Sequence, residues 1–328
     1  MSNRRIVSGM RPTGKLHLGH FHGVLANWRE LQESYECFFF AADWHSLTTE
    51  YDNTDGIREN TRDMVLDWLA FGIDPVKSVV FAQSRVPQHA ELNLVLSMIT
   101  PVSWLERNPT YKEMQENLAA KDLSTFGFLG YPVLMAADII LYKAGKVPVG
   151  HDQLPHLEIT REIARRFNFL YGREVFPEPQ ALLTETPKVL GLDGRKMSKS
   201  YGNAIFLSET ADETRKKVMS MVTDVQRPRR VDPGEPDRCV AFSLNRLYIP
   251  EEKRNELINA CRGAQIGCVD CKKLQAEYLV ETLAPFRLKR EELAATSGMV
   301  EEILADGNAK AAAEAARTMA EVREAIKF

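Results

Sequence analysis

Hydrophobic residues in the first half of the chain follow two alternating patterns. Short apolar runs of strand length occur at 6–8, 37–42 and 78–82. Between them, apolar residues recur at helical spacing from Leu18 to Leu31 and again over 56–71. The run at 37–42 is apolar throughout, which is typical of a strand buried on both faces of a parallel sheet. This alternation predicts an α/β fold built on a Rossmann-type, doubly wound parallel sheet.

The second half of the chain predicts helices. Helical spacing returns at 135–142 and 156–167, and strand signals fade after Ser200. The later segments predicted to be helical are 209–222, 251–262, 272–282 and the alanine-rich 309–327. We therefore predict a Rossmann-type domain over 1–190, a loop over 191–205 and an all-helical C-terminal domain over 206–328.

Composition and charge narrow the class of protein only slightly. The formal net charge of the 328 residues is −3, so overall charge predicts no polyanion partner. Contact with nucleic acid would depend on local basic patches at 227–230 and 287–290. The N-terminal residues contain no apolar stretch of signal-peptide length, and no segment has the apolar length of a membrane span. These features predict a cytoplasmic protein without a membrane partner.

Two short segments carry candidate chemistry for a nucleotide. His17-Leu18-Gly19-His20 lies at the turn from the first strand to the first helix, where a helix N-terminus stabilises phosphate. Gly19 leaves room for a base against the backbone, and the two imidazoles can donate to phosphate oxygens as charge develops. Lys196-Met197-Ser198-Lys199-Ser200 lies on a glycine-flanked loop, from which lysines can close on a leaving pyrophosphate.

These two segments resemble the HIGH and KMSKS signatures of class I aminoacyl-tRNA synthetases. The resemblance implies activation of an amino acid by adenylation, with ATP accompanied by Mg2+. It implies catalytic roles for His17, His20, Lys196 and Lys199. The ATP-binding residues that it implies are Arg11, Pro12, Thr13, Gly19, His20, Gly150, His151, Asp152, Val189, Lys196, Met197, Ser198, Lys199 and Ser200.

Two further segments, 130–139 and 149–158, resemble the substrate helix and the following block of tryptophanyl-tRNA synthetases. The resemblance assigns Asp138 to the indole nitrogen and implies L-tryptophan, tRNA(Trp) and a homodimeric partner. The physical chemistry agrees, because indole has one N–H donor and a buried carboxylate would be left unpaired by phenylalanine. The other residues expected to line the amino-acid pocket are Met135, Tyr131, Gln153, Gly9 and His45.

Three alternatives remain open from the sequence. A tyrosyl-tRNA synthetase shares the fold and both signatures. A small nucleotidyltransferase of the same superfamily has a related His-x-Gly-His, but lacks the long helical domain. A redox-sensing RNA-binding protein on a synthetase scaffold would need neither signature intact.

Four cysteines in the second half have the spacing C-x21-C-x6-C-x2-C, which supplies the ligands of a tetrahedral zinc or a cubane iron–sulfur cluster. These candidate metal ligands are Cys239, Cys261, Cys268 and Cys271. A similar pattern in a subset of bacterial tryptophanyl enzymes favours a [4Fe–4S] cluster over Zn2+. We expect it to stabilise the helical domain or help place the tRNA anticodon, with Arg262, Lys272 and Lys273 available to phosphate. Cys37 lies in a predicted strand and is expected to be plain core.

Overall fold

The structure is a computed structural model that describes residues 4–109, 124–183 and 188–328. The chain forms two compact units, neither of which is continuous in sequence. The first comprises Met1–Gly14, Asn27–Glu185 and Thr296–Phe328, and the second comprises Lys15–Ala26 and Thr186–Ala295. No helix within the described ranges is long and apolar enough to cross a membrane.

The first unit is built on a parallel sheet, as its apolar runs predict. Its strands are β1 (Arg5–Met10), β2 (Glu36–Ala41), β3 (Ser78–Ala82), β4 (Lys146–Val149) and β5 (Gln180–Leu183). They lie in the order β3-β2-β1-β4-β5, and every neighbouring pair is parallel. The register pairs Val7 with Phe38 and Phe38 with Val79, so the apolar run of β2 is buried between β1 and β3. This is the order of a Rossmann-type fold.

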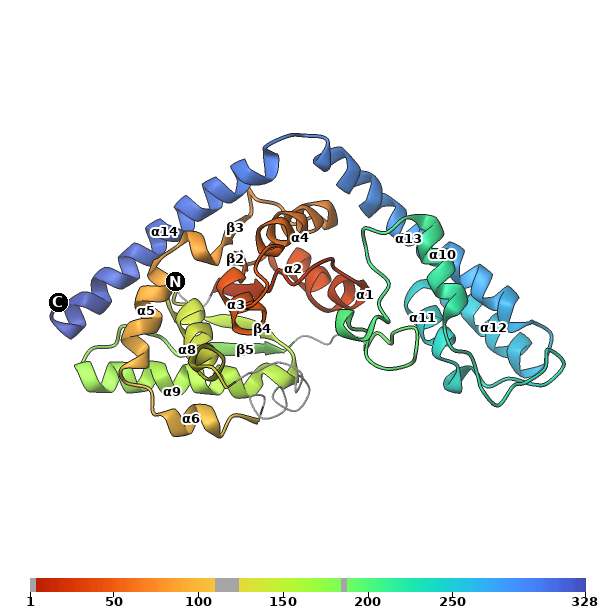
Figure 1. The fold of residues 1–328 in the computed structure, drawn as a ribbon, viewed down its shortest axis with the longest axis horizontal. Helices are drawn as coiled ribbons and strands as arrows, with labels where there is room; N and C mark the ends of the chain where they lie inside the picture. The colour runs from red at the N-terminus through yellow and green to blue at the C-terminus, as the bar shows by residue number, and fades with distance from the viewer. Residues whose placement is uncertain (1–3, 110–123, 184–187) are drawn as a thin grey trace. The chain divides into compact units, whose positions relative to one another are not determined.

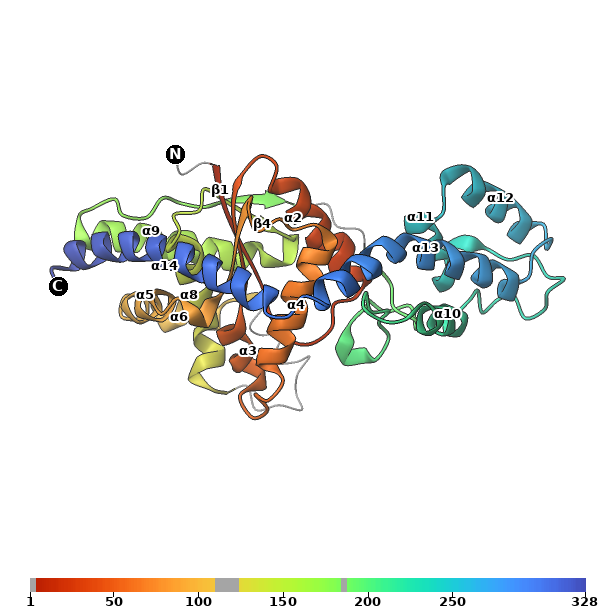
Figure 2. The same ribbon diagram turned by 90° about the horizontal axis from the view of Figure 1, so that it is seen from above.

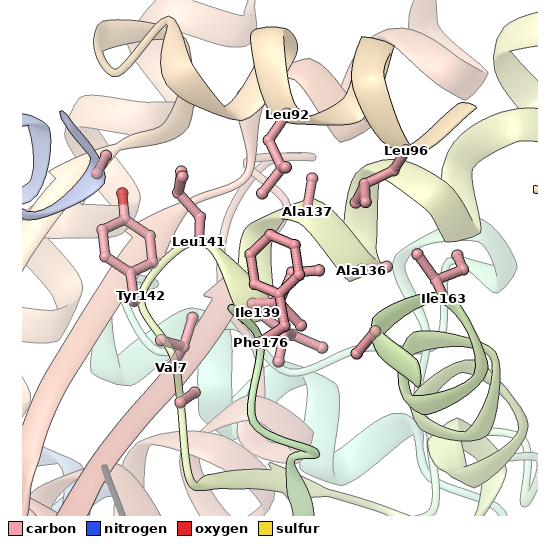
Figure 3. Close-up of a cluster of buried hydrophobic side chains, with 14 of the residues drawn as sticks. Val7, Leu92, Leu96, Ala136, Ala137, Ile139, Leu141, Tyr142, Ile163 and Phe176 are labelled. Atoms are coloured by element: carbon pink, nitrogen blue, oxygen red, sulfur yellow. The ribbon is translucent and has the colours of Figure 1, made fainter. Parts of the chain in front are cut away.

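Helices surround this sheet (Figure 1). They are α2 (Ala26–Leu31), α3 (Asp43–Glu50), α4 (Ile57–Phe71), α5 (Gln88–Ser97), α6 (Val102–Glu106), α8 (Phe126–Ile140), α9 (Leu154–Tyr171) and α14 (Met299–Ile326). Two short 3-10 turns, η3 (Gln83–Arg85) and η4 (His151–Gln153), follow β3 and β4. Figure 3 shows how Leu92 and Leu96 of α5 and Ala137 of α8 meet in the buried core, which also includes Tyr142.

The edge strand β3 is covered by α14 (Figure 1). A Cβ atom on Gly307 would lie 1.8 Å from the carbonyl oxygen of Val80, so the helix approaches the strand backbone as only glycine permits. Asn308 Oδ1 also accepts a hydrogen bond of 2.9 Å from the amide of Ala82. The helix therefore satisfies part of an edge that would otherwise be open to pairing.

The compact units differ from the predicted segments in three places. Residues 296–328, predicted within the helical domain 206–328, pack with the sheet because α14 covers β3. Residues 15–26 and 188–190, both predicted within 1–190, join the second unit. The functional division into a catalytic part, a loop and a tRNA-binding part stays a prediction.

The second unit consists of helices and turns. Its elements are α1 (Leu18–His20), the π-helical turn η2 (Phe21–Leu25), η5 (Lys199–Tyr201), α10 (Ala211–Ser220), η6 (Pro236–Arg238), α11 (Val240–Tyr248), α12 (Glu251–Arg262) and α13 (Cys268–Ala294). α10 and α11 pack against α13, the long helix of this unit, and α12 packs against α11 (Figure 2). Buried Gln275 of α13 donates from Nε2 to the carbonyl oxygen of Ala241, which ties α13 to α11.

Candidate active site

The strand order shows where a nucleotide can bind in the first unit. β1 leads to β2 on one side, whereas β4, on the other side of β1, leads outward to β5. Ligands of doubly wound folds bind at such a switch point, outside the carboxyl ends of the strands. β1 is followed there by residues 11–14, and β4 by Gly150, His151 and Asp152. These predicted ATP-binding residues therefore follow two adjacent strand ends.

Close packing leaves no room for a side chain at two glycines near these strand ends. A Cβ atom on Gly9 would lie 2.4 Å from the ring of Phe40, so the side chain of β2 occupies the space beside β1. A Cβ atom on Gly150 would lie 2.7 Å from Oδ1 of Asp152. Substitution at either position would displace a neighbour even without a ligand.

Asp138, the predicted indole acceptor, is a buried carboxylate of α8 with only 2% of its surface exposed. His45 Nε2 lies 2.9 Å from its Oδ2. Gln83 Nε2 and His89 Nδ1 each lie 2.7 Å from its Oδ1. Burial alone would raise the pKa of Asp138, but the hydrogen bonds from His45 and His89 outweigh burial and lower it. The carboxylate is therefore held ionised inside the protein.

A second pair of side chains comes from α8 and α9. The Tyr131 hydroxyl is 2.6 Å from His156 Nε2. Burial raises the pKa of Tyr131 to about 12, although Arg11 acts in the opposite direction. Burial first, and then the nearby His45, lower the pKa of His156 to about 4. His45 contacts Asp138 and also lowers the pKa of His156. The Tyr131–His156 pair and the Asp138 cluster therefore belong to one polar region of the first unit.

Two other predicted pocket residues also lie in the first unit. Met135 of α8 is partly buried and packs against the main core. Gln153 of η4 donates from Nε2 to Oδ2 of Asp152 at 3.1 Å. Met135 therefore contacts the core, and Gln153 contacts Asp152.

The histidine signature caps its own helix. His17 Nδ1 accepts from the amide of Gly19 at 3.1 Å, and His20 Nδ1 accepts from the amide of His17 at 3.2 Å. Because both Nδ1 atoms accept, the proton of each neutral imidazole lies on Nε2, which can donate to an anion. A Cβ atom on Gly19 would lie 2.8 Å from the His17 ring, so this glycine also makes room for the cap.

The lysine signature lies in the same unit and influences both histidines. Burial first, and then Lys199 and Lys196, lower the pKa of His17 to about 4. Burial, followed by His17 and Lys199, holds the pKa of His20 well below its usual value. The two signatures are therefore close in space, although most of the sheet domain separates them in sequence. Both histidines are therefore neutral near pH 7, so each can act as a hydrogen-bond donor but not as a cation.

Buried Asn203, which follows the lysine signature, connects the two sides of its loop. Its Oδ1 accepts from the amide of Ser198 at 2.8 Å, and its Nδ2 donates to Asp193 Oδ1 at 2.7 Å. A Cβ atom on Gly191 would lie 2.3 Å from the Asn203 side chain. Met197, buried between the two lysines of the signature, pairs with Val189 through a backbone hydrogen bond of 3.0 Å. The loop 189–203 is thus held at its base.

The four cysteines gather in the second unit without forming disulfides. Burial first, and then the other three thiols, raise the pKa of Cys271 to about 11, while a hydrogen bond from Asn245 opposes them. Arg227 Nη1 lies 3.7 Å from Cys261 Sγ and 4.0 Å from Cys268 Sγ. In the described part of the chain, no three or more His, Cys, Asp or Glu side chains are positioned to hold a metal ion as they stand.

Several basic residues proposed for phosphate contact have partners within the protein. Arg227 is buried, and its Nη2 donates to the carbonyl oxygens of Arg230 and Ile266. Lys272 Nζ donates to the carbonyl oxygens of Met219 and Met221 at the end of α10. Such a lysine satisfies orphan helix carbonyls rather than facing a solvent-side phosphate.

Arg262 is also engaged, since it pairs with Glu235 at 2.8 Å. Arg227, Lys272 and Arg262 therefore offer less positive charge to a polyanion than the sequence suggests.

The structure adds four residues to those predicted from sequence: Gln83, His89, Tyr142 and Asn203. Each is buried. A lone buried polar residue more often satisfies a core group than contacts a ligand, and the first three come from separate segments. Only Asn203 had a sequence signal, its place three residues after the lysine signature.

Comparison with known proteins agrees with this geometry. A family model described as tRNA synthetases class I (W and Y) matches residues 2–284. Among curated proteins, the tryptophan–tRNA ligase of Thermotoga maritima is 54% identical over 99% of this chain and 99% of its own length. The tryptophan–tRNA ligase of Aquifex aeolicus is 47% identical over 99% of this chain and 100% of its own length.

Among solved structures, tryptophanyl-tRNA synthetase from Campylobacter jejuni, complexed with ADP and tryptophan, superposes with a TM-score of 0.90. It is 34% identical, and the match covers 99% of this chain and 100% of that one. The family model and the full-length relatives give the same answer: this chain belongs to the class I tRNA synthetases of the tryptophan and tyrosine group.

Proposed function

We propose that this protein is a tryptophan–tRNA ligase, which uses ATP to join L-tryptophan to tRNA(Trp). The observation that carries the proposal is Asp138, an ionised carboxylate with 2% exposure in the segment that resembles the tryptophanyl substrate helix. It matches the single N–H donor of indole. The full-length relatives of 47% and 54% identity bear the same activity in their names.

The activation step needs no covalent nucleophile on the enzyme. An oxygen of the tryptophan carboxylate attacks the α-phosphorus of ATP, which forms tryptophanyl-adenylate and releases pyrophosphate. His17 and His20 donate from Nε2 to phosphate oxygens, while Lys196 and Lys199 balance the charge of the leaving pyrophosphate. Mg2+ enters with ATP. In the second step, a ribose hydroxyl at the 3′ end of tRNA attacks the adenylate carbonyl carbon and AMP leaves.

The remaining predicted residues take binding roles in this proposal. Those assigned to ATP are Arg11, Pro12, Thr13, Gly19, Gly150, His151, Asp152, Val189, Met197, Ser198 and Ser200. Those assigned to tryptophan besides Asp138 are Gly9, His45, Tyr131, Met135 and Gln153. The strand ends at the switch point and the mutual influence of the two signatures support these assignments.

Exchange of labelled pyrophosphate into ATP tests the proposal. Tryptophan should stimulate the exchange, and Asp138→Ala should reduce it by at least about 100-fold while ATP still binds, because the indole loses its acceptor. Asp306→Ala, which removes an exposed carboxylate of α14, serves as the matched control and should leave exchange unchanged. Stimulation by tyrosine instead would identify the tyrosyl activity, and no exchange with either amino acid would reject the synthetase function.

We also propose that Cys239, Cys261, Cys268 and Cys271 hold a [4Fe–4S] cluster, with Zn2+ as the alternative for the same ligands. The mutual influence of the four thiols supports the proposal, although their side chains would have to turn toward a common point. Arg227 supports it too, since this 8%-exposed guanidinium faces two of the thiols and has no carboxylate partner among the described residues. Metal-bound thiolates would supply the negative charge that such a buried cation requires.

Metal analysis after anaerobic purification distinguishes the outcomes. About four iron and four sulfide per chain with a brown colour would establish the cluster, and one zinc in a colourless protein would establish the alternative. Cys271→Ser should abolish binding of either metal. Cys37→Ser is the control, because Cys37 is buried in β2, and should leave the metal content unchanged. Wild-type protein that contains neither metal would reject the site.

The tRNA and the dimer complete the proposal. We assign tRNA contact to the helices α10–α13, and we place the enzyme in the cytoplasm, where tRNA is charged for translation. Lys273→Ala should reduce the slope of log tRNA affinity against log salt concentration by the amount expected for about one phosphate contact, and an unchanged slope would reject that contact.

Light scattering should report a homodimer, and a monomeric mass at micromolar concentration would contradict it.

A further inference from the structure

The two oxygens of Asp138 have unequal surroundings. Oδ1 receives two donors, Gln83 Nε2 and His89 Nδ1, each at 2.7 Å. Oδ2 receives one donor among the described residues, His45 Nε2 at 2.9 Å. A carboxylate oxygen has two lone pairs, so Oδ1 is saturated while Oδ2 can accept one more hydrogen bond.

His89 is fixed as a donor by the residue behind it. Its Nε2 lies 2.7 Å from the Tyr142 hydroxyl, and both side chains are 0% exposed. Burial first, and then Asp138, raise the pKa of Tyr142 well above its usual value, so the hydroxyl keeps its proton. The ionised Asp138 can only accept, so the imidazole proton lies on Nδ1, which faces it, and Nε2 of the neutral imidazole accepts from the Tyr142 hydroxyl.

Gln83 reinforces this arrangement from a third element. It lies in η3 and is 0% exposed. Only its amide NH2 can approach an ionised carboxylate favourably, so the amide orientation is determined by Asp138. The three donors, Gln83, His89 and His45, come from η3, α5 and α3. Together they fix the orientation of the Asp138 carboxylate and stabilise its negative charge.

We propose that Gln83 and His89, the latter oriented by Tyr142, are positioning residues that saturate Oδ1 of Asp138 and direct the indole N–H of tryptophan to Oδ2. This inference rests on the proposed function. Without the donor at His89, Oδ1 would be free to bind water or to turn, and the carboxylate would no longer offer one acceptor in one direction. Selectivity for an N–H group would then fall more than the general binding of a large aromatic ring.

Two variants of His89 test the proposal in the whole enzyme. His89→Leu removes both hydrogen bonds, while His89→Asn keeps an amide donor near the position of Nδ1. Pyrophosphate exchange is measured with tryptophan and with its benzothiophene analogue, which has sulfur in place of the indole N–H. In His89→Leu we expect KM for tryptophan to rise about tenfold or more, and the preference for tryptophan over the analogue to fall by a similar factor. His89→Asn should restore much of the preference.

Leu96→Ala is the matched control, because Leu96 is buried on the same helix and makes no hydrogen bond to Asp138. It should lower stability and leave the preference unchanged. Equal losses for tryptophan and the analogue in His89→Leu would overturn the proposal, since a purely structural residue behaves in that way.

A substrate-free measurement separates this inference from the proposed function. Nitrogen-15 NMR of histidine-labelled wild-type protein should show His89 protonated on Nδ1 alone, with the signal assigned by its loss in His89→Asn. Protonation on Nε2 alone, or on both nitrogens, would overturn the network whether or not the enzyme activates tryptophan. Failure of tryptophan to stimulate exchange in the wild type, with the expected tautomer present, would instead reject the proposed function.

Discussion

Gly307→Ala tests the close packing between α14 and β3. At an open position in a helix interior, this change would stabilise the helix by about 1 kcal/mol, because alanine has the higher helix propensity. Here the new Cβ would lie 1.8 Å from the carbonyl oxygen of Val80 and 2.7 Å from its carbonyl carbon. A normal contact needs at least about 3.4 Å, so the helix must withdraw by roughly 1.5 Å. Both obstructing atoms belong to backbone, which cannot rotate away.

The cost has two parts. Overpacking of this kind costs about 1–3 kcal/mol. Withdrawal of α14 also breaks the hydrogen bond from the Ala82 amide to Asn308, which leaves a strand N–H without its partner at about 1–3 kcal/mol. After the gain in propensity, we expect a net loss of roughly 3 kcal/mol in the free energy of unfolding.

Chemical denaturation measures the global effect, and hydrogen exchange of the α14 and β3 amides localises it, which matters because the chain has two compact units. Ala309→Gly, at an exposed position of the same helix, is the control and should cost only about 1 kcal/mol. An increase in stability for Gly307→Ala, or unchanged protection of α14 and β3, would refute the packing argument.

Two further predictions concern the loop and the titration of buried histidines. Asn203→Ala should lower the rate of tryptophan-dependent pyrophosphate exchange by about 10- to 100-fold with KM for tryptophan unchanged, because the loop that carries Lys196 loses its internal hydrogen bonds; an unchanged rate would contradict this role. Stability should fall as pH drops from about 6.5 to about 4, since the unfolded chain takes up protons that buried His17 and His156, each with a pKa lowered to about 4, do not. Each histidine contributes a slope of up to about 1.4 kcal/mol per pH unit in this range, so His156→Gln should flatten the dependence of the unfolding free energy on pH, and equal slopes in urea titrations would contradict it.

Elements with a clear period were predictable from sequence. The runs 6–8, 37–42 and 78–82 correspond to β1, β2 and β3, and the helix predicted over 251–262 corresponds to α12. β4 and β5 have four residues each, and β4 contains Pro148, so neither has enough alternation to stand out. The helix predicted over 272–282 extends through Pro285 to Ala294, because tertiary contacts along α13 outweigh the local cost of an internal proline.

The site residues also fall into those that the sequence predicts and those that it does not. Residues in short signatures, such as His17 and Lys199, are predictable because their chemistry is concentrated in a few consecutive positions. The partners of Asp138 cannot, since His45, Gln83 and His89 lie on three elements and meet only when the sheet is formed. Long-range convergence of single polar residues has no local pattern.

The covering of β3 by α14 has a consequence for synthesis on the ribosome. β3 ends at Ala82, and the helix that protects its edge begins at Met299, so the whole intervening chain and α14 itself must be made before protection is possible. During that interval the nascent sheet presents an unpaired strand, which is a template for pairing with other chains. Chains that stop before α14 would keep this edge exposed permanently. Early termination products should therefore aggregate or depend on chaperones, even though they contain every strand of the sheet.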